Sequence, residues 1–269
     1  MSGGIAQGIK RWMRITRLVV HVARGVATSA FLFPLQSPER RKREIEHWSL
    51  SLLDILNVRL FLHGMPPVYG VRPLMLVANH VSWLDILAIN AVVPSRFVAK
   101  SEVRAWPLVG WLSARAGTLF IERARRHDTA RINHAVSAAM LSGDVFAVFP
   151  EGTTTDGSTV LKFHASLLQP AREADAAIQP VALWYDRSDG TLCTEAAYAA
   201  GRSLWGSLMA ITGQHEILAH VCFLDPIVSD ERHRRDLAME ARDAIVRTLF
   251  PAMRDSRTDT DADLRVVAR

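Results

Sequence analysis

Two short apolar runs, each followed at once by a cluster of polar residues, constrain the fold of this chain more than any other feature. Residues 74–78 (LMLVA) lead into residues 79–85 (NHVSWLD), and residues 145–148 (VFAV) lead into residues 149–153 (FPEGT). Uninterrupted apolar runs of this length are typical of strands that are buried on both faces of a sheet. The sequence therefore predicts two buried strands, whose polar clusters can converge at one edge of a sheet.

Strand and helix patterns alternate along the chain, which predicts an α/β fold: a mixed sheet flanked by helices. With 269 residues the chain can bury a sizeable core, and we place one domain at residues 57–253, followed by a charged, mobile tail at residues 254–269. Strands are expected at residues 58–64, 74–78, 96–100, 118–122, 145–149, 178–184 and 217–224. Helices are expected between and after them at residues 82–93, 102–116, 129–141, 164–174 and 231–249, and Pro107 is expected to break or start the second of these.

Residues 1–56 are expected to form two helices ahead of the sheet. The first covers residues 5–33 and ends near Pro34. The second begins with Ser37 as its N-cap and Pro38 at its first helical position, and it runs to about Leu56. Together they predict an N-terminal helical hairpin.

The first of these helices is both basic and apolar. Four basic residues at positions 10–17 precede the apolar residues 18–33, which also contain His21 and Arg24. No small-residue cleavage site follows, and the stretch is shorter than the roughly 20 residues of a clean membrane span. We favour an interfacial helix on an anionic membrane surface, with arginines at the lipid headgroups. A single span and a core helix with a charged face are the alternatives.

The composition excludes several classes of protein. Hydrophobic residues make up 49% of the chain and charged residues 22%, which argues against a disordered chain and an ordinary multi-span membrane protein. The net charge of +5 suits an anionic lipid or a phosphorylated substrate, whereas no nucleic-acid recognition motif is present. Cys193 and Cys222, the only cysteines, lack metal-ligand spacing. We expect no metal site and a reducing compartment.

His80 and Asp85 fit the roles of a general base and its orienting acid. An imidazole can take the proton of a hydroxyl near neutral pH, and a carboxylate bonded to the other ring nitrogen fixes its tautomer. Positions five apart on a regular helix differ by roughly 140° in direction. His80 is therefore expected in the turn before the helix and Asp85 in its first two turns, with Ser82 as the N-cap. The alternative is structural: Asn79 and His80 cap the helix, and Asp85 is solvated.

Four blocks of sequence, in order over residues 74–183, resemble the glycerolipid acyltransferase family. The family motifs are Asn-His-x-x-x-x-Asp, Gly-x-x-Phe-Ile-Asp/Glu-Arg, Phe-Pro-Glu-Gly-Thr, and a short strand with a central proline. The matching segments are residues 79–85 (NHVSWLD), 117–123 (GTLFIER), 149–153 (FPEGT) and, loosely, 178–182 (IQPVA). The first block alone is weak, but the four together are a specific signal.

The resemblance implies a membrane-associated O-acyltransferase of lipid biosynthesis. Such an enzyme moves a fatty acyl group from acyl-CoA or acyl carrier protein to the free hydroxyl of a lyso-lipid, at the cytoplasmic face of the cell membrane. His80 and Asp85 would be its catalytic pair, and no resident cofactor is implied. The implied substrate-binding residues are Asn79, Arg123, Glu151, Gly152 and Thr153. A glycine such as Gly152 can also present its backbone N–H to an anion.

No serine occurs in a glycine-flanked elbow, and Ser82 is better explained as a cap. We therefore expect the acceptor hydroxyl to attack a thioester directly, without an acyl-enzyme. A lipid or acyl-thioester hydrolase that uses the same pair, His80 and Asp85, is the alternative.

The third block departs from the family pattern at one position. Many phosphatidate-forming members carry an arginine after the threonine, where this chain has Thr154, and Asp156 lies close by. Arg123 would then supply most of the anion binding, helped by Lys162 if the loop folds back. A less anionic acceptor, such as a lyso-ornithine lipid or another lysophospholipid, is therefore a serious candidate beside lysophosphatidic acid.

Overall fold

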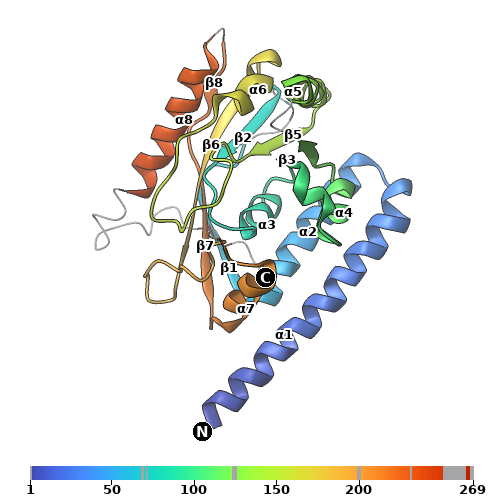
Figure 1. Ribbon diagram of the computed structural model, residues 1–269, viewed down its shortest axis with the longest axis vertical. Helices are drawn as coiled ribbons and strands as arrows, with labels where there is room; N and C mark the ends of the chain where they lie inside the picture. The colour runs from blue at the N-terminus through green and yellow to red at the C-terminus, as the bar shows by residue number, and fades with distance from the viewer. Residues whose placement is uncertain are drawn as a thin grey trace.

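The described part of the chain folds around one mixed sheet of nine strands, which Figure 1 shows in a computed structural model. The structure describes residues 2–67, 70, 72–122, 126–198, 201–230, 232–250 and 265–266. The strand order is β4-β3-β5-β2-β6-β7-β1-β9, and β8 pairs with β6. The strands are β1 Val58–Gly64, β2 Leu74–Ala78, β3 Arg96–Lys100, β4 Leu119–Ile121, β5 Val145–Val148, β6 Ala177–Asp186, β7 Ile217–Phe223, β8 Ile227–Val228 and β9 Arg265–Val266. The predicted fold class is confirmed.

Strand β2 lies in the middle of the sheet and is parallel to both of its neighbours. Val77 is opposite Val148 of β5 on one side and Pro180 of β6 on the other. All residues of β2 and β5 are buried, as the apolar runs predict. Because β2 and β5 are parallel, the polar clusters that follow them lie at the same edge of the sheet.

Helices cover both faces of the sheet, and β2 supplies side chains to both sides. Leu74, Leu76 and Ala78 belong to the core cluster that includes α2 and α3. Met75 and Val77 belong to the cluster on the opposite face, which includes α5 and α8. The helices are α1 Ser2–Ala27, α2 Pro38–Leu56, α3 Leu84–Asn90, α4 Val109–Arg115, α5 Arg126–Leu141, α6 Gln169–Glu173, α7 Leu204–Gly213 and α8 Arg234–Leu249.

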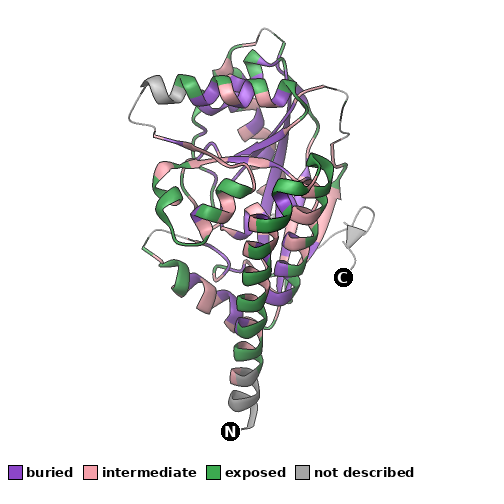
Figure 2. Cartoon of the chain, turned by 90° about the vertical axis from the view of Figure 1, so that its right-hand side faces the viewer, coloured by how far each residue is buried: buried purple, intermediate pink, exposed green. Residues whose placement is uncertain are grey.

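Helices α1 and α2 form the expected hairpin beside the sheet (Figure 1). After α1 the chain continues through a π-helical turn, Thr28–Leu32, and a 3-10 turn, Phe33–Leu35. The Ser37 hydroxyl accepts a hydrogen bond from the Arg40 N–H at 3.3 Å and caps α2, as predicted. Most of α1 is solvent-exposed (Figure 2).

Contacts of His21 and Arg14 are among those that hold α1 against the rest of the protein. The His21 ring stacks on Trp48 of α2 with ring centroids 5.1 Å apart, and Gly25 leaves room for the same indole. At the C-terminal end of α7, the Arg14 guanidinium donates to the carbonyls of Thr212 and Gln214 at 3.3 and 2.8 Å. Cations interact favourably with the carbonyls at a helix C-terminus, so Arg14 fixes α1 at a second place.

Several helical segments differ in detail from the prediction, and the helix expected over residues 164–174 is a 3-10 helix, Ala165–Leu168, followed by α6. The helix expected over residues 102–116, with a break or a start at Pro107, is divided into a 3-10 helix, Ser101–Ala105, and α4, on either side of that proline. Leu108, just before α4, has a φ of 61°, a conformation that breaks a continuous helix. Helix α7 was not predicted, although Ser203 caps it by accepting from the Gly206 N–H at 3.0 Å. The serine and the apolar residues after it are the signal that sequence reasoning missed.

Most of the tail expected at residues 254–269 lies outside the described residues. Its described part, β9, pairs antiparallel with β1, with Arg265 opposite Leu62.

Three titratable side chains meet on neighbouring strands β1, β7 and β6. His63 Nε2 lies 3.0 Å from His220 Nδ1, and His220 Nε2 lies 3.5 Å from the Asp186 carboxylate. The Trp184 ring stacks on His220, with centroids 4.6 Å apart, and its indole N–H donates to Asp186. Burial, helped by His63, lowers the pKa of His220 to about 3, and burial raises the pKa of Asp186 to about 6. At neutral pH the cluster therefore holds a partly buried carboxylate beside two neutral imidazoles.

Asp186→Asn is expected to stabilise the protein above pH 6 and to change little near pH 4. A carboxyl group whose pKa is higher in the folded than in the unfolded state favours folding when protonated, and this contribution is lost as pH rises from about 4 to 6. Removing the charge should raise the free energy of unfolding by on the order of 1–2 kcal/mol at pH 8. Thermal unfolding of both proteins at pH 4 and pH 8 measures this. Equal melting temperatures at pH 8 would contradict it.

Candidate active site

Asp85 holds the imidazole of His80 at the carboxyl end of β2. His80 Nδ1 lies 2.7 Å from the Asp85 Oδ2 atom. The same oxygen accepts hydrogen bonds from the backbone N–H groups of Val81 and Ser82 at 2.8 and 2.9 Å. The other carboxylate oxygen accepts from the Tyr185 hydroxyl at 2.6 Å. The Asp85 side chain is completely buried, and four donors satisfy it.

The local chain path produces this geometry. Strand β2 ends at Ala78, and α3 begins at Leu84, so His80 lies in the turn between them and Asp85 in the first turn of the helix. This is the placement that the five-residue spacing predicts. The prediction that Ser82 is the N-cap is wrong, because Trp83 occupies that position without a side-chain cap. The Ser82 hydroxyl makes no hydrogen bond among the described residues, and the Asp85 carboxylate holds the turn instead by accepting from the Ser82 N–H.

Tyr185 is a member of the site that sequence reasoning missed. It lies near the end of β6, which pairs with β2, and only this pairing brings it to Asp85. Burial and the neighbouring carboxylate raise the pKa of Tyr185 well above its ordinary value. The hydroxyl therefore stays protonated and donates. No spacing in the sequence signals a contact across about a hundred residues.

The second ring nitrogen of His80 is available for chemistry. A carboxylate can only accept, so Nδ1 carries the proton toward Asp85 and Nε2 carries a lone pair. Within the described residues, no hydrogen bond occupies Nε2. The ring stacks on Phe149, with centroids 4.0 Å apart, and its side chain is 19% exposed. Such an arrangement can accept a proton from a hydroxyl group.

Glu151 ties the second polar cluster to the first. One of its carboxylate oxygens accepts from the His80 backbone N–H at 2.7 Å, and the other from the Leu161 N–H at 2.8 Å. The residue is 4% exposed, and burial raises its pKa despite these bonds. The Thr155 N–H donates in turn to the His80 carbonyl at 2.8 Å. The segment of residues 149–155 thus holds both the N–H and the carbonyl of His80.

The remaining predicted substrate-binding residues lie in different surroundings. Asn79 is buried, and its amide exchanges two hydrogen bonds with the backbone of Leu183, at 2.9 and 2.8 Å. Gly152 adopts a φ of 73°, and its N–H donates to the Phe149 carbonyl within the turn. This N–H therefore makes its hydrogen bond within the turn, and a role for Gly152 in binding an anion stays a prediction. Thr153 is exposed, and Arg123 lies outside the described residues.

The loop after the FPEGT residues is fastened by its own side chains. The Thr154 hydroxyl donates to the Tyr198 carbonyl, and the Tyr198 N–H donates to the Val81 carbonyl at 2.8 Å. Asp156 accepts from the hydroxyl and the N–H of Ser158, and these bonds lower its pKa. Asp156 is exposed and therefore places a negative charge at the surface of this loop.

Comparison with known proteins identifies the family. A family model described as Acyltransferase matches residues 59–184. A lyso-ornithine lipid O-acyltransferase from Pseudomonas aeruginosa is 37% identical over 81% of this chain and 83% of its own length. A 1-acyl-sn-glycerol-3-phosphate acyltransferase from Neisseria meningitidis is 34% identical over 91% of this chain and 97% of its own.

The fold is also known from a crystal structure. The 1-acyl-sn-glycerophosphate acyltransferase PlsC from Thermotoga maritima superposes with a TM-score of 0.69 at 21% identity, covering 96% of this chain and 99% of that one. Together, the matched sequence blocks, the relatives and the shared fold show that this chain is an enzyme of the acyltransferase family.

Proposed function

We propose that this enzyme moves a fatty acyl group from an acyl thioester, acyl-CoA or acyl carrier protein, to the free hydroxyl of a lyso-lipid. One observation carries the proposal: His80 is anchored through Nδ1 to a buried carboxylate, and its Nε2 is left for the acceptor. The names of both types of relative point to the same reaction class.

In the proposed reaction, His80 acts as a general base. Nε2 takes the proton of the acceptor hydroxyl while that oxygen attacks the thioester carbonyl carbon. The tetrahedral intermediate collapses with cleavage of the carbon–sulfur bond, and the proton passes to the departing thiolate. Asp85 stabilises the imidazolium that forms between these steps. No described serine or cysteine lies within hydrogen-bond distance of His80, so we propose direct transfer without an acyl-enzyme.

Glu151 and Asn79 fit positioning roles better than direct contact with the acceptor. Both oxygens of Glu151 and both polar atoms of Asn79 are already bonded to backbone groups. We propose that Glu151 fixes the backbone of His80 and that Asn79 fixes the end of β2 against β6. Binding of the acceptor headgroup is left to Arg123 and to exposed residues such as Thr153.

We further propose that α1 places the enzyme on the cytoplasmic face of the cell membrane. Residues Lys10–Leu35 form a helical segment whose most apolar stretch has a mean hydropathy of 1.6, and only 17% of that stretch is buried. Phe31 and Leu35 are 74% and 85% exposed. A helical segment that exposes this many apolar side chains is typical of a surface that contacts lipid.

His80→Ala is expected to lower kcat by roughly 10²–10⁴-fold, the usual cost of losing a general base. Among the described residues, the His80 side chain makes one hydrogen bond, to Asp85, and one ring stack, on Phe149, so the fold should persist. Thioester consumption and lipid product are measured together, with and without lyso-lipid, and circular dichroism checks the fold. A folded variant with more than about half of the wild-type activity would refute this role for His80.

Tyr185→Phe is expected to retain transfer but to move the acid limb of the pH–rate profile to higher pH. The change removes one donor from Asp85, so the carboxylate attracts the imidazolium more strongly. A purely structural role for Tyr185 would lower stability and leave the shape of the profile unchanged. The measurement is kcat/KM against pH for both proteins.

Thr154→Arg is expected to shift acceptor preference toward lysophosphatidic acid. A phosphate monoester favours bidentate arginine donors, whereas Thr154 and the exposed Asp156 offer none here. The ratio of kcat/KM for lysophosphatidic acid over lyso-ornithine lipid should rise about tenfold or more. Thr154→Gln, which adds length without charge, is the control. A wild-type ratio above roughly a hundred, about 2.7 kcal/mol, would show that other residues supply the phosphate site.

Phe31→Ser combined with Leu35→Ser is expected to weaken binding to lipid vesicles without unfolding the protein. Both side chains are largely exposed, so their removal costs little packing. Met239→Ser on α8 removes a side chain that is 60% exposed on another helix and serves as the control. Co-sedimentation with vesicles measures the effect. Equal binding of the double variant and the control would place the lipid contact elsewhere.

A further inference from the structure

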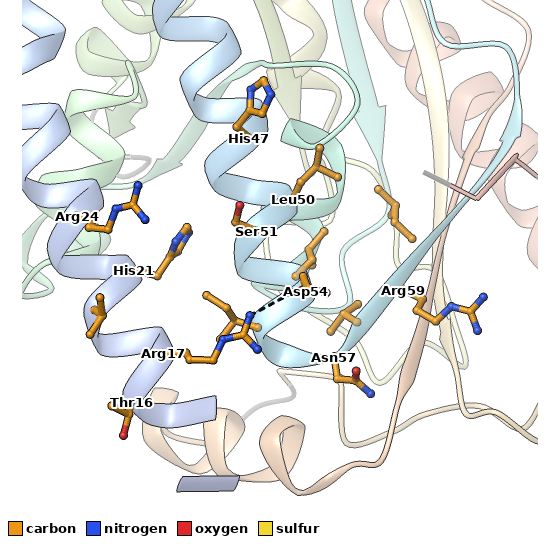
Figure 3. Close-up of a pocket in the computed structure, with 15 residues that line it drawn as sticks. Thr16, Arg17, His21, Arg24, His47, Leu50, Ser51, Asp54, Asn57 and Arg59 are labelled. Carbon is orange, nitrogen blue, oxygen red and sulfur yellow. Dashed lines mark hydrogen bonds and ion pairs between the residues drawn. The ribbon is translucent and has the colours of Figure 1, made fainter. Parts of the chain in front are cut away.

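A groove of about 1180 Å³ lies between α1, α2 and the first residues of β1 (Figure 3). It is separate from the candidate active site, because neither His80 nor Glu151 lines it. Its polar walls come from both helices of the hairpin. Among the lining residues that Figure 3 labels are Thr16, Arg17, His21, Arg24, His47, Asp54 and Arg59.

The groove carries an excess of positive charge. Three arginines line it, against the single carboxylate of Asp54. Arg59 is balanced by Glu216, 3.5 Å away. Arg24 is exposed, and its side chain makes no salt bridge or hydrogen bond with any residue in the described ranges. Arg24 is therefore the cation that an incoming anion meets first.

Arg17 can also turn toward an anion at small cost. Its salt bridge to Asp54 is 3.3 Å long, but the two side chains are 57% and 54% exposed. Water and salt screen such a pair, so it holds the guanidinium only weakly. Burial is the main cause that lowers the pKa of His21, and the nearby Arg24 lowers it further. The two arginines, and not His21, supply the positive charge at neutral pH.

The groove opens next to the apolar surface of α1. At 100° per residue, Arg17 and Arg24 share one stripe of the helix, and Met13 and Val20 lie on the neighbouring stripe. Met13 is 61% exposed and Val20 is 55% exposed, and Val20 itself lines the groove. A lipid whose acyl chains lie against this apolar stripe has its headgroup at the level of the two arginines.

We propose that the groove binds the phosphate of an anionic bilayer phospholipid that is not a substrate, through Arg17 and Arg24. This inference rests on the membrane contact of α1 proposed above. A guanidinium fork suits a phosphate because it can donate two parallel hydrogen bonds. The bound lipid would hold α1 at the membrane and so set the orientation of the hairpin there.

The test uses the full chain and vesicles of phosphatidylcholine, with or without phosphatidylglycerol. Wild type is compared with Arg17→Gln/Arg24→Gln, with the charge-preserving Arg17→Lys/Arg24→Lys, and with Arg235→Gln/Arg247→Gln. The last variant removes the same charge from exposed positions on α8, away from the groove. Co-sedimentation gives the affinities, circular dichroism checks the fold, and free glycerol phosphate is added as a competitor.

The glutamine pair in the groove should lose about tenfold or more of its affinity for phosphatidylglycerol vesicles. It should bind phosphatidylcholine vesicles as wild type does, and the α8 control should change far less. The lysine pair should also bind more weakly than wild type, because lysine lacks the fork. If the lysine pair binds the vesicles as tightly as wild type does, the groove attracts anions through its net charge alone, and the proposed phosphate site is overturned.

Two further outcomes separate this inference from the proposed function. Displacement of the protein from vesicles by free glycerol phosphate would show that the groove binds a soluble anion instead of a lipid. If wild type binds neither kind of vesicle, the membrane contact of α1 and the groove site are both overturned. If wild type binds both kinds of vesicle, and the glutamine pair in the groove binds them as tightly as the α8 control does, the groove site alone is overturned. Acyl transfer, measured separately in detergent, should be the same in all four proteins.

Discussion

The fully buried carboxylate of Asp85 is the interaction on which the site depends. A buried charge is costly unless donors surround it, and Asp85 has four: His80 Nδ1, two backbone N–H groups and the Tyr185 hydroxyl. The two N–H groups belong to the turn between β2 and α3, so the carboxylate also sets the path of the chain there. The hydrogen bonds of Asp85 that orient the His80 imidazole therefore also fix the turn between β2 and α3. A change that disturbs the turn also disturbs the imidazole.

The central strand of the sheet gives this turn a fixed place. β2 lies between two parallel neighbours. Beyond the last hydrogen bond between these strands, side chains continue to hold the chain that follows β2 against both of them. Asn79 takes both hydrogen bonds of the Leu183 backbone on the β6 side, while Glu151 holds the His80 N–H on the β5 side. Both are buried and use their polar atoms fully, so neither requires a substrate to be satisfied. The two motifs meet because the sheet places the ends of parallel strands at one edge.

Local signals in the sequence predicted the elements well where one interaction decides the structure. Apolar runs located β2 and β5, and Ser37 located the start of α2. The predictions failed where the chain path places a suitable side chain away from its expected partner, or where the partner is distant in sequence. Ser82 looks like a cap, but its hydroxyl makes no hydrogen bond among the described residues, and Trp83 occupies the N-cap position. Tyr185 reaches Asp85 only after β6 pairs with β2, a register that no local pattern encodes.

In the proposed reaction, buried residues orient His80, whereas exposed residues meet the headgroup of the acceptor. The groups that orient His80 are buried and bonded to backbone, so they are insensitive to the headgroup that the acceptor carries. Thr153 and Asp156, in contrast, lie exposed in a loop whose shape is held by other bonds, such as that of Thr154 to Tyr198. Substitutions there can change the charge that an acceptor meets without moving Asp85 or His80. In the proposed reaction, selection of the acceptor headgroup by this loop is therefore separate from the geometry that orients His80.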